Sequence, residues 1–262
     1  MNVFVNLPLR YIHADRNYLD YFLAHRLQPE LGIDVIAIEQ IDGAWHQSIA
    51  DAFRTAGLAC AVHLPFFDLQ PGSIDPAILQ ATRQRLISAS AVARRYSPQH
   101  LISHAGFNDV YEEFYEEWLA NCRTTWLEFT QSWQDHPPVY LENVYEETYK
   151  PLVDLQKSLA KKTFGICFDA GHWHSFSQGV QRKNLREWIV GLAPFLRHLH
   201  LHDNDGVCDR HWGLGRGTIP WEELFAVVQE LGLKVSITLE PHSEKDLEQS
   251  LAFIERHRAW FQ

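Results

Sequence analysis

The sequence predicts a closed (β/α)₈ barrel, in which eight parallel strands alternate with eight helices. Short apolar segments alternate with longer amphipathic segments from end to end, which is the pattern of repeated βα units. The first apolar segment is followed by Leu7, Pro8 and Leu9 and not by the glycine-rich phosphate turn that an open doubly wound sheet would have. No linker rich in Ser, Gly or Pro interrupts the chain, so we expect one domain over residues 1–262.

The apolar segments give the expected strands in chain order: 3–7, 33–39, 58–64, 100–104, 138–143, 164–169, 197–202 and 234–240. The amphipathic segments between them give the expected helices: 15–26, 47–56, 75–95, 110–133, 150–161, 184–193, 220–231 and 244–259. In such a barrel the carboxyl ends of the strands and the loops after them build the active face.

Composition narrows the class of protein. The chain is 46% hydrophobic and 21% charged, so it can bury a full core. Its net charge of −10 disfavours nonspecific binding to nucleic acid or to an acidic membrane surface. The four cysteines show no C-x-x-C spacing, which indicates reduced thiols in a cytoplasmic protein. We expect no signal peptide at the start and no membrane span, because no run of about 18 apolar residues occurs.

Six consecutive strands, the third to the eighth, are expected to end in or near a residue that can bind a divalent metal ion. Imidazole nitrogens and carboxylate oxygens both bind such ions well. A lone histidine or acid at a strand end is usually capped or solvated, but recurrence at the same end of six strands predicts a metal site. The candidate metal ligands are His63, His104, Glu142, Asp169, His172, His200, Asp209, His211 and Glu240.

Other polar residues near these strand ends have other expected roles. His198 and His202 share a strand face with His200, but a strand end usually lends one side chain to a metal, so we expect them to support ligands or contact substrate. Glu39 is expected to end the second strand and to face the same rim as a candidate substrate contact. Cys208 is expected to be a packing residue rather than a ligand.

Several short motifs surround the candidate ligands: VHLPF, SHAG, LENV, FDAGH, HLHD, DRH, LGRGTI and LEP. With them the chain, from about Ala61 to Pro241, resembles the xylose isomerase-like TIM-barrel superfamily and, within it, the endonuclease IV branch of family 2 AP endonucleases. That resemblance implies that the nine candidate residues hold up to three zinc ions. The superfamily also contains sugar isomerases and epimerases, which implies a second arrangement: one Mn²⁺, Mg²⁺ or Co²⁺ ion on Glu142, Asp169, His200 and Glu240.

The three-ion and the one-ion arrangements differ in the net charge of the site. The nine residues carry −4 with their histidines neutral, which three divalent ions would change to +2 and one ion to −2. A positive site suits a phosphate. We therefore expect a hydrolase that acts on a phosphoester or phosphodiester of a small sugar- or nucleotide-derived substrate, with Glu142, Glu240 and His172 as catalytic residues.

The alternatives stay open at this point. The main one is a single-metal sugar or sugar-phosphate isomerase or epimerase that uses Glu142 and Glu240 as acid and base. An AP endonuclease that acts on DNA and a cobamide nucleotide-loop phosphodiesterase are weaker readings, and the acidic net charge disfavours DNA as a partner. A protein whose metals only stabilise the barrel is disfavoured, because structural zinc sites are usually rich in cysteine. The substrate is expected to be a small molecule.

Overall fold

The computed structural model describes residues 1–262. Its eight strands are parallel and follow one another around a closed barrel in chain order, β1 to β8, which confirms the predicted fold class. The register matters for the site: Asp169 of β6 pairs with His200 of β7, and His200 pairs with Thr238 of β8. None of the helices combines the length and the apolar composition that crossing a membrane requires.

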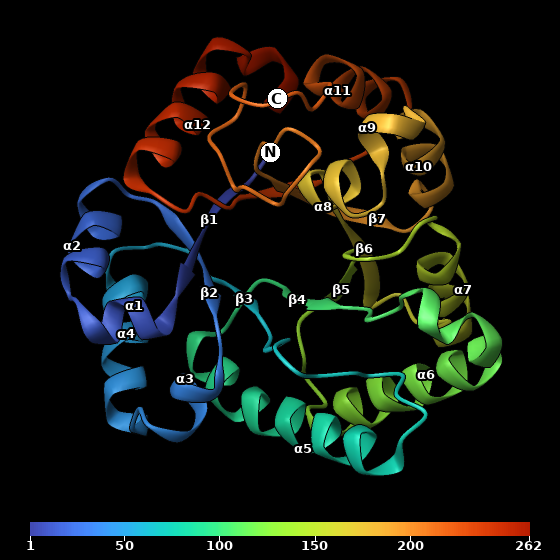
Figure 1. Ribbon diagram of the computed structural model, residues 1–262. Coiled ribbons are helices and arrows are strands. Elements are labelled where there is room, and N and C mark those ends of the chain that lie inside the picture. The colour runs from blue at the N-terminus through green and yellow to red at the C-terminus, as the bar shows by residue number, and fades with distance from the viewer. The chain divides into compact units, whose positions relative to one another are not determined.

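The chain divides into two compact units, of which the first comprises residues 1–3, 104–115 and 141–262. Helices α10 and α11 pack against each other, and α8 lies against β6 and β7 (Figure 1, yellow to orange). The elements of this unit are η2 Asp109–Phe114, β5 Val139–Glu142, α7 Lys150–Leu159, β6 Phe164–Asp169, α8 Ala170–Ser175, α9 Gly179–Arg182, α10 Leu185–Leu192, β7 Leu196–Leu201, α11 Trp221–Glu230, β8 Ser236–Leu239, α12 Glu244–Arg256 and η3 Arg258–Phe261.

The second unit comprises residues 4–103 and 116–140. Helix α3 packs against α5 (Figure 1, blue to green). The elements of this unit are β1 Val3–Pro8, α1 Leu9–Ala14, α2 Asn17–Ala24, β2 Gln28–Gly32, α3 Val35–Glu39, α4 Gly43–Thr55, β3 Ala61–His63, α5 Pro76–Ala93, η1 Arg94–Tyr96, β4 Leu101–His104 and α6 Tyr115–Ser132.

The predicted second strand is wrong. The strand is Gln28–Gly32, and the apolar residues after it form helix α3. The Asp34 carboxylate accepts a hydrogen bond from the Ala37 N–H at 2.9 Å, so it caps the helix where sequence alternation had suggested a strand. Glu39 therefore ends a helix rather than a strand, and its carboxylate pairs with Arg85 at 2.6 Å.

Candidate metal centre

Four buried side chains of the first unit form what we call the strand cluster: Glu142, Asp169, His200 and Glu240. Glu142 and Asp169 are the last residues of β5 and β6, His200 lies in β7, and Glu240 follows β8. One donor atom from each lies within 4.8 Å of all the others. The His200 Nδ1 atom is 3.1 Å from Glu142 Oε1 and 3.3 Å from Glu240 Oε1, so one imidazole nitrogen contacts both glutamates.

Asn143 fixes the ends of β5 and β6 together, a role that the sequence alone did not reveal. Its side-chain amide donates to the Asp169 carbonyl at 3.0 Å, and its side-chain oxygen accepts from the Asp169 N–H at 2.8 Å. Asn143 is fully buried. The pair of bonds sets the spacing between Glu142 and Asp169, which gives the asparagine after the glutamate in the LENV motif a structural purpose.

Glu142 extends the strand cluster toward β4. Its Oε1 atom faces His200, and its Oε2 atom lies 3.5 Å from His104 Nε2 at the end of β4. The two oxygens of one carboxylate thus face different imidazoles. A carboxylate placed in this way can bridge two adjacent cations.

The FDAGH motif is a helix start built around Asp169. The Asp169 Oδ1 atom accepts a hydrogen bond from the His172 N–H at 2.6 Å and caps α8, which leaves Oδ2 directed at His200 and His202. Gly171 allows the His202 ring to pack directly against the backbone of α8. A Cβ atom at this position would lie only 1.9 Å from His202 Cε1. This short helix was not among the expected elements, although the aspartate before small residues indicates a cap.

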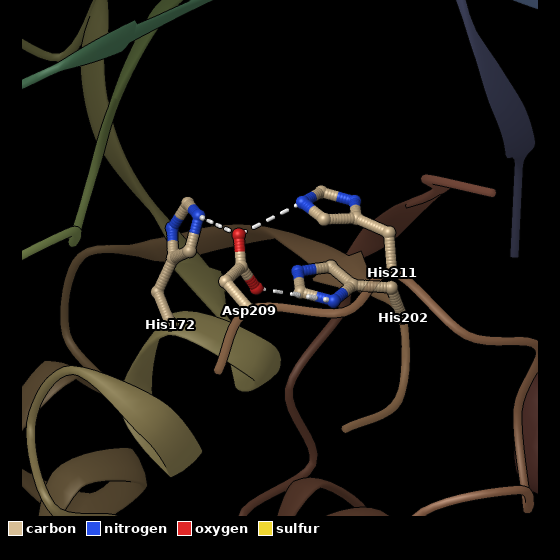
Figure 2. A group of neighbouring side chains, drawn as sticks. All are labelled: His172, His202, Asp209 and His211. Carbon is tan, nitrogen blue, oxygen red and sulfur yellow. Dashed lines mark hydrogen bonds and ion pairs between the residues drawn. The ribbon is translucent and has the colours of Figure 1, made fainter. Parts of the chain in front are cut away.

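A second group in the same unit, which we call the loop cluster, consists of His172, His202, Asp209 and His211. His172 comes from α8, His202 follows β7, and Asp209 and His211 come from the segment between β7 and α11. Asp209 lies at the centre with the three imidazole rings around it (Figure 2). Its Oδ2 atom is 3.5 Å from His172 Nε2 and 2.9 Å from His211 Nε2.

The segment from residue 202 to residue 220, which we call the β7–α11 loop, is held by Asp203. The buried Asp203 carboxylate accepts hydrogen bonds from the Gly215 N–H at 2.9 Å and from the Trp221 indole at 2.9 Å. Its backbone forms an antiparallel bridge with Trp212. Gly217 has no room for a Cβ atom, which would lie 2.3 Å from Asp203 Oδ1. These contacts fold the loop back on itself and so position the residues that lie between Asp203 and Trp212.

The electrostatics of the two clusters favour positive charge. Burial lowers the pKa of His211, but the Asp209 and Glu240 carboxylates outweigh it and raise that pKa to about 9. Burial likewise opposes protonation of His172, yet Asp169, Asp209 and Glu142 raise its pKa well above the ordinary value. The pKa of Glu240 is raised by burial. The nearby carboxylates thus favour a positive charge at both imidazoles.

Divalent cations fit this donor set. The His202 Nδ1 and Asp209 Oδ1 atoms are buried, have no hydrogen-bond partner and lie 3.6 Å apart. Buried polar atoms are normally hydrogen-bonded, so two unsatisfied atoms that face each other indicate a ligand between them. Imidazole and carboxylate donors suit zinc and similar ions.

The structure brings eight of the nine predicted ligands together in the first unit. The ninth, His63, ends β3 in the second unit, where its ring is buried and its Nδ1 atom lies 2.8 Å from the Leu64 carbonyl oxygen. His202 is the residue whose role the sequence-based prediction underrated. Its position two residues after His200 indicated that it faces the same side as His200, because alternate strand residues share a face.

The remaining histidines have other partners. The His198 ring nitrogens lie 2.7 Å from Ser236 Oγ and 2.9 Å from Thr238 Oγ1. His174 Nε2 lies 2.9 Å from Thr218 Oγ1. His242 is exposed and stacks on His211 with ring centroids 4.0 Å apart.

An all-parallel eight-stranded barrel with acids and imidazoles at its strand ends defines a (β/α)₈ protein with a candidate divalent-metal site. The chain belongs to the xylose isomerase-like TIM barrel family, whose sequence profile matches residues 26–257. The resemblance inferred from the motifs is therefore confirmed.

Similar proteins agree with this assignment. The uncharacterized protein MJ1311 of Methanocaldococcus jannaschii is 26% identical over 204 residues, which cover 75% of this chain and 69% of that protein. The TTHB071 protein of Thermus thermophilus, solved after soaking with ZnCl₂, is 28% identical with a TM-score of 0.80 and covers 98% of this chain and 97% of its own. A D-tagatose 3-epimerase-like protein is 20% identical with a TM-score of 0.81 and covers 99% and 97% of the two chains.

A fourth similar structure is the D-psicose 3-epimerase of Clostridium cellulolyticum H10 with D-tagatose, which is 15% identical with a TM-score of 0.76 and covers 100% of both chains. The family and these structures indicate an enzyme. None of them shows the expected phosphoester hydrolysis, and the likeness to the two epimerase structures, at 20% and 15% identity, is one of fold.

Proposed function

We propose that the protein is a metal-dependent sugar isomerase or epimerase. The observation that carries the proposal is the placement of two buried glutamates beside one imidazole nitrogen. Glu142 Oε1 and Glu240 Oε1 lie 3.1 Å and 3.3 Å from the same His200 nitrogen. The similar epimerases add support at the level of the fold.

The strand cluster supplies the residues that this reaction needs. A divalent ion held by its four side chains would act as a Lewis acid toward the carbonyl and hydroxyl oxygens of the substrate. One glutamate accepts the proton from the carbon next to the carbonyl, and the other returns a proton. Return to the opposite face of the same carbon gives an epimer, and return to the neighbouring carbon gives an isomer. Burial raises the pKa of Glu240, which makes it a stronger base near neutral pH.

Solvent exchange tests the proposal. The manganese-loaded protein is incubated with D-psicose, D-tagatose and D-fructose in D₂O, and after removal of the protein and metal, proton NMR follows the carbon next to the carbonyl. We expect deuterium at that carbon and formation of the epimeric or isomeric sugar. Glu142→Gln and Glu240→Gln should each abolish exchange, whereas Glu244→Gln, an exposed acid on α12, serves as the matched control.

Phosphoester hydrolysis is the second candidate, and the loop cluster is the observation that favours it. Four more donors beside the strand cluster, together with His104 near Glu142, exceed the ligands that one ion needs. Release of nitrophenol from a bis-nitrophenyl phosphodiester by the zinc-loaded protein, with no deuterium exchange into any sugar, would replace the isomerase proposal with this one.

A further inference from the structure

The His198 ring is held at both of its nitrogens by hydroxyl groups of the neighbouring strand. His198 Nδ1 lies 2.7 Å from Ser236 Oγ, and His198 Nε2 lies 2.9 Å from Thr238 Oγ1. His198 and Thr238 are fully buried, and Ser236 is half-buried. A hydroxyl group can donate and accept, so these partners suit either tautomer of the imidazole. A ring held at two nitrogens cannot turn without breaking one of these contacts.

The two hydroxyl groups lie at successive levels of the barrel. In the register of β7 and β8, His198 is paired with Ser236, and His200 is paired with Thr238. Alternate residues of a strand face the same side, so the His198 ring spans from its own level to the level of His200. A slip of one residue between the strands would turn both hydroxyl groups to the opposite face. The His198 contacts therefore fix the position of β8 along β7.

The His200 ring packs on this fixed ring. The ring centroids of His198 and His200 lie 5.3 Å apart with the planes at 83°, which is an edge-to-face arrangement. Cys167 of β6 is paired with His198, and one donor atom each of Cys167, His198 and His200 lies within 4.8 Å of the others. All three side chains are fully buried. Because protein interiors are close-packed, a shift of the His198 ring would shift the His200 ring with it.

The strand cluster lies at the next level. His200 Nδ1 contacts Glu142 and Glu240, as described above. The Glu240 N–H donates to the Leu201 carbonyl at 3.2 Å, so pairing between the two chain segments continues past the end of β8. The position of His198 thus acts on two members of the strand cluster: on His200 through ring packing, and on Glu240 through the register of β8.

We propose that His198 is a positioning residue of the strand cluster, which orients His200 and Glu240 for proton transfer. The effect on turnover rests on the proposed function, whereas the effect on metal binding does not. Removal of a group that orients metal ligands typically costs roughly 10- to 100-fold in metal affinity or activity. His198 acts through the geometry of the two glutamates and not through contact with the sugar, so kcat should fall while KM stays.

Variants that remove the contacts one at a time test this role. His198→Ala removes both contacts. His198→Gln carries an amide that can reach the position of Nε2 and so can keep the contact with Thr238. Thr238→Val and Ser236→Ala each remove a single hydroxyl group and leave the ring in place, so they remain informative if His198→Ala does not fold.

His46→Gln is the matched control. His46 is a buried histidine of the second unit, and its ring nitrogens lie 2.8 Å from the Tyr96 hydroxyl oxygen and 2.9 Å from the Ala37 carbonyl oxygen. It belongs to neither cluster. His46→Gln should lose stability to a similar extent as His198→Gln, and its metal binding and turnover should equal those of the wild type.

Two measurements are made on each variant. Binding of Mn²⁺ to the chelator-stripped protein is followed by electron paramagnetic resonance, because three carboxylates and one imidazole suit this ion. The values of kcat and KM are measured at saturating Mn²⁺ with D-psicose, D-tagatose and D-fructose. We expect His198→Ala to lower Mn²⁺ affinity and kcat, each roughly 10- to 100-fold, with KM within about twofold of the wild type. Thr238→Val should lose less, and His198→Gln should recover part of the loss.

The outcomes distinguish this role from the proposed reaction. Wild-type Mn²⁺ affinity and kcat in His198→Ala, or in Thr238→Val if His198→Ala does not fold, would overturn the proposal. Equal losses in His46→Gln would also overturn it, because lower stability alone would then account for them. A raised KM with unchanged kcat would place His198 in sugar binding instead. If Mn²⁺ affinity falls as expected while the wild-type protein converts no sugar, the positioning role stands and the isomerase proposal fails.

Discussion

The strand cluster and the loop cluster use the same kinds of donor but are held in different ways. Every member of the strand cluster lies at or within one residue of a strand end, so barrel register places it, with the Asn143 bonds between β5 and β6. The loop cluster takes one residue from α8, one from the end of β7 and two from the β7–α11 loop, so it depends on a cap, a glycine and the contacts of Asp203. The strand cluster is therefore fixed by the barrel, whereas the loop cluster is fixed by the folding of the β7–α11 loop.

Glu142→Gln should produce the largest effect on the strand cluster. It removes a carboxylate that moves a proton, and we expect sugar turnover to fall roughly 10²- to 10⁴-fold. Zinc-dependent stabilisation at the loop cluster should persist, because Glu142 is not part of that cluster. Turnover close to that of the wild type would remove the distinction between the two clusters.

Stripping zinc from the loop cluster should produce the next largest effect, and on stability. Free zinc at about one hundred times its Kd stabilises the folded protein by about 2.7 kcal/mol. That corresponds to a rise in Tm of roughly 5–10 °C for a chain of this size. Calorimetry with zinc and with EDTA measures the difference. His211→Ala should lose most of the zinc-dependent shift, whereas His242→Ala should keep it.

Gly171→Ala tests the loop cluster separately from the strand cluster, because it displaces the His202 ring without removing any metal-binding atom. The new Cβ atom would lie 1.9 Å from His202 Cε1, and we expect a loss of about 1–3 kcal/mol in the free energy of unfolding together with weaker zinc binding at the loop cluster. Gly191→Ala is the matched control, because its Cβ atom would meet the Tyr149 ring at 2.4 Å, and neither residue belongs to a cluster. Weaker zinc binding in both variants would point to a general effect of overpacking.

The pH dependence of stability should change sign with zinc. In EDTA, the raised pKa of His211, about 9, stabilises the folded protein fully below its unfolded value near 6.5, and this contribution is lost as the pH rises toward 9. Zinc needs the neutral imidazole, so zinc-dependent stabilisation should grow over the same interval. Thermal unfolding from pH 6.5 to 9 measures both trends, and parallel curves with and without zinc would contradict the assignment of His211.

Tyr145→Ala should have the smallest effect. Tyr145 is exposed and packs on Phe176, which stacks on His172, so the pair can contact the apolar face of a sugar beside the site. Loss of an aromatic contact of about 0.5–1.5 kcal/mol raises KM roughly 2- to 10-fold. The value of kcat should be unchanged. A large fall in kcat would place Tyr145 in the chemistry instead.

The barrel and the strand cluster were predictable because both follow from periodicity. Alternating apolar segments indicated the βα units, and the polar residues at their ends indicated Glu142, Asp169 and Glu240. The second strand was misplaced because the Asp34 cap acts through a local hydrogen bond that alternation does not report. His202 was underrated because its role depends on how the β7–α11 loop folds back, which the Asp203 contacts decide.

The most direct test is a crystal structure of the zinc-loaded protein with the anomalous signal of zinc. At the loop cluster we expect one ion bound by nitrogen atoms of His172 and His211 and by an oxygen of Asp209. At the strand cluster we expect an ion with at least one position open to solvent or sugar. A strand cluster without a bound ion would contradict the metal centre on which the proposed function depends.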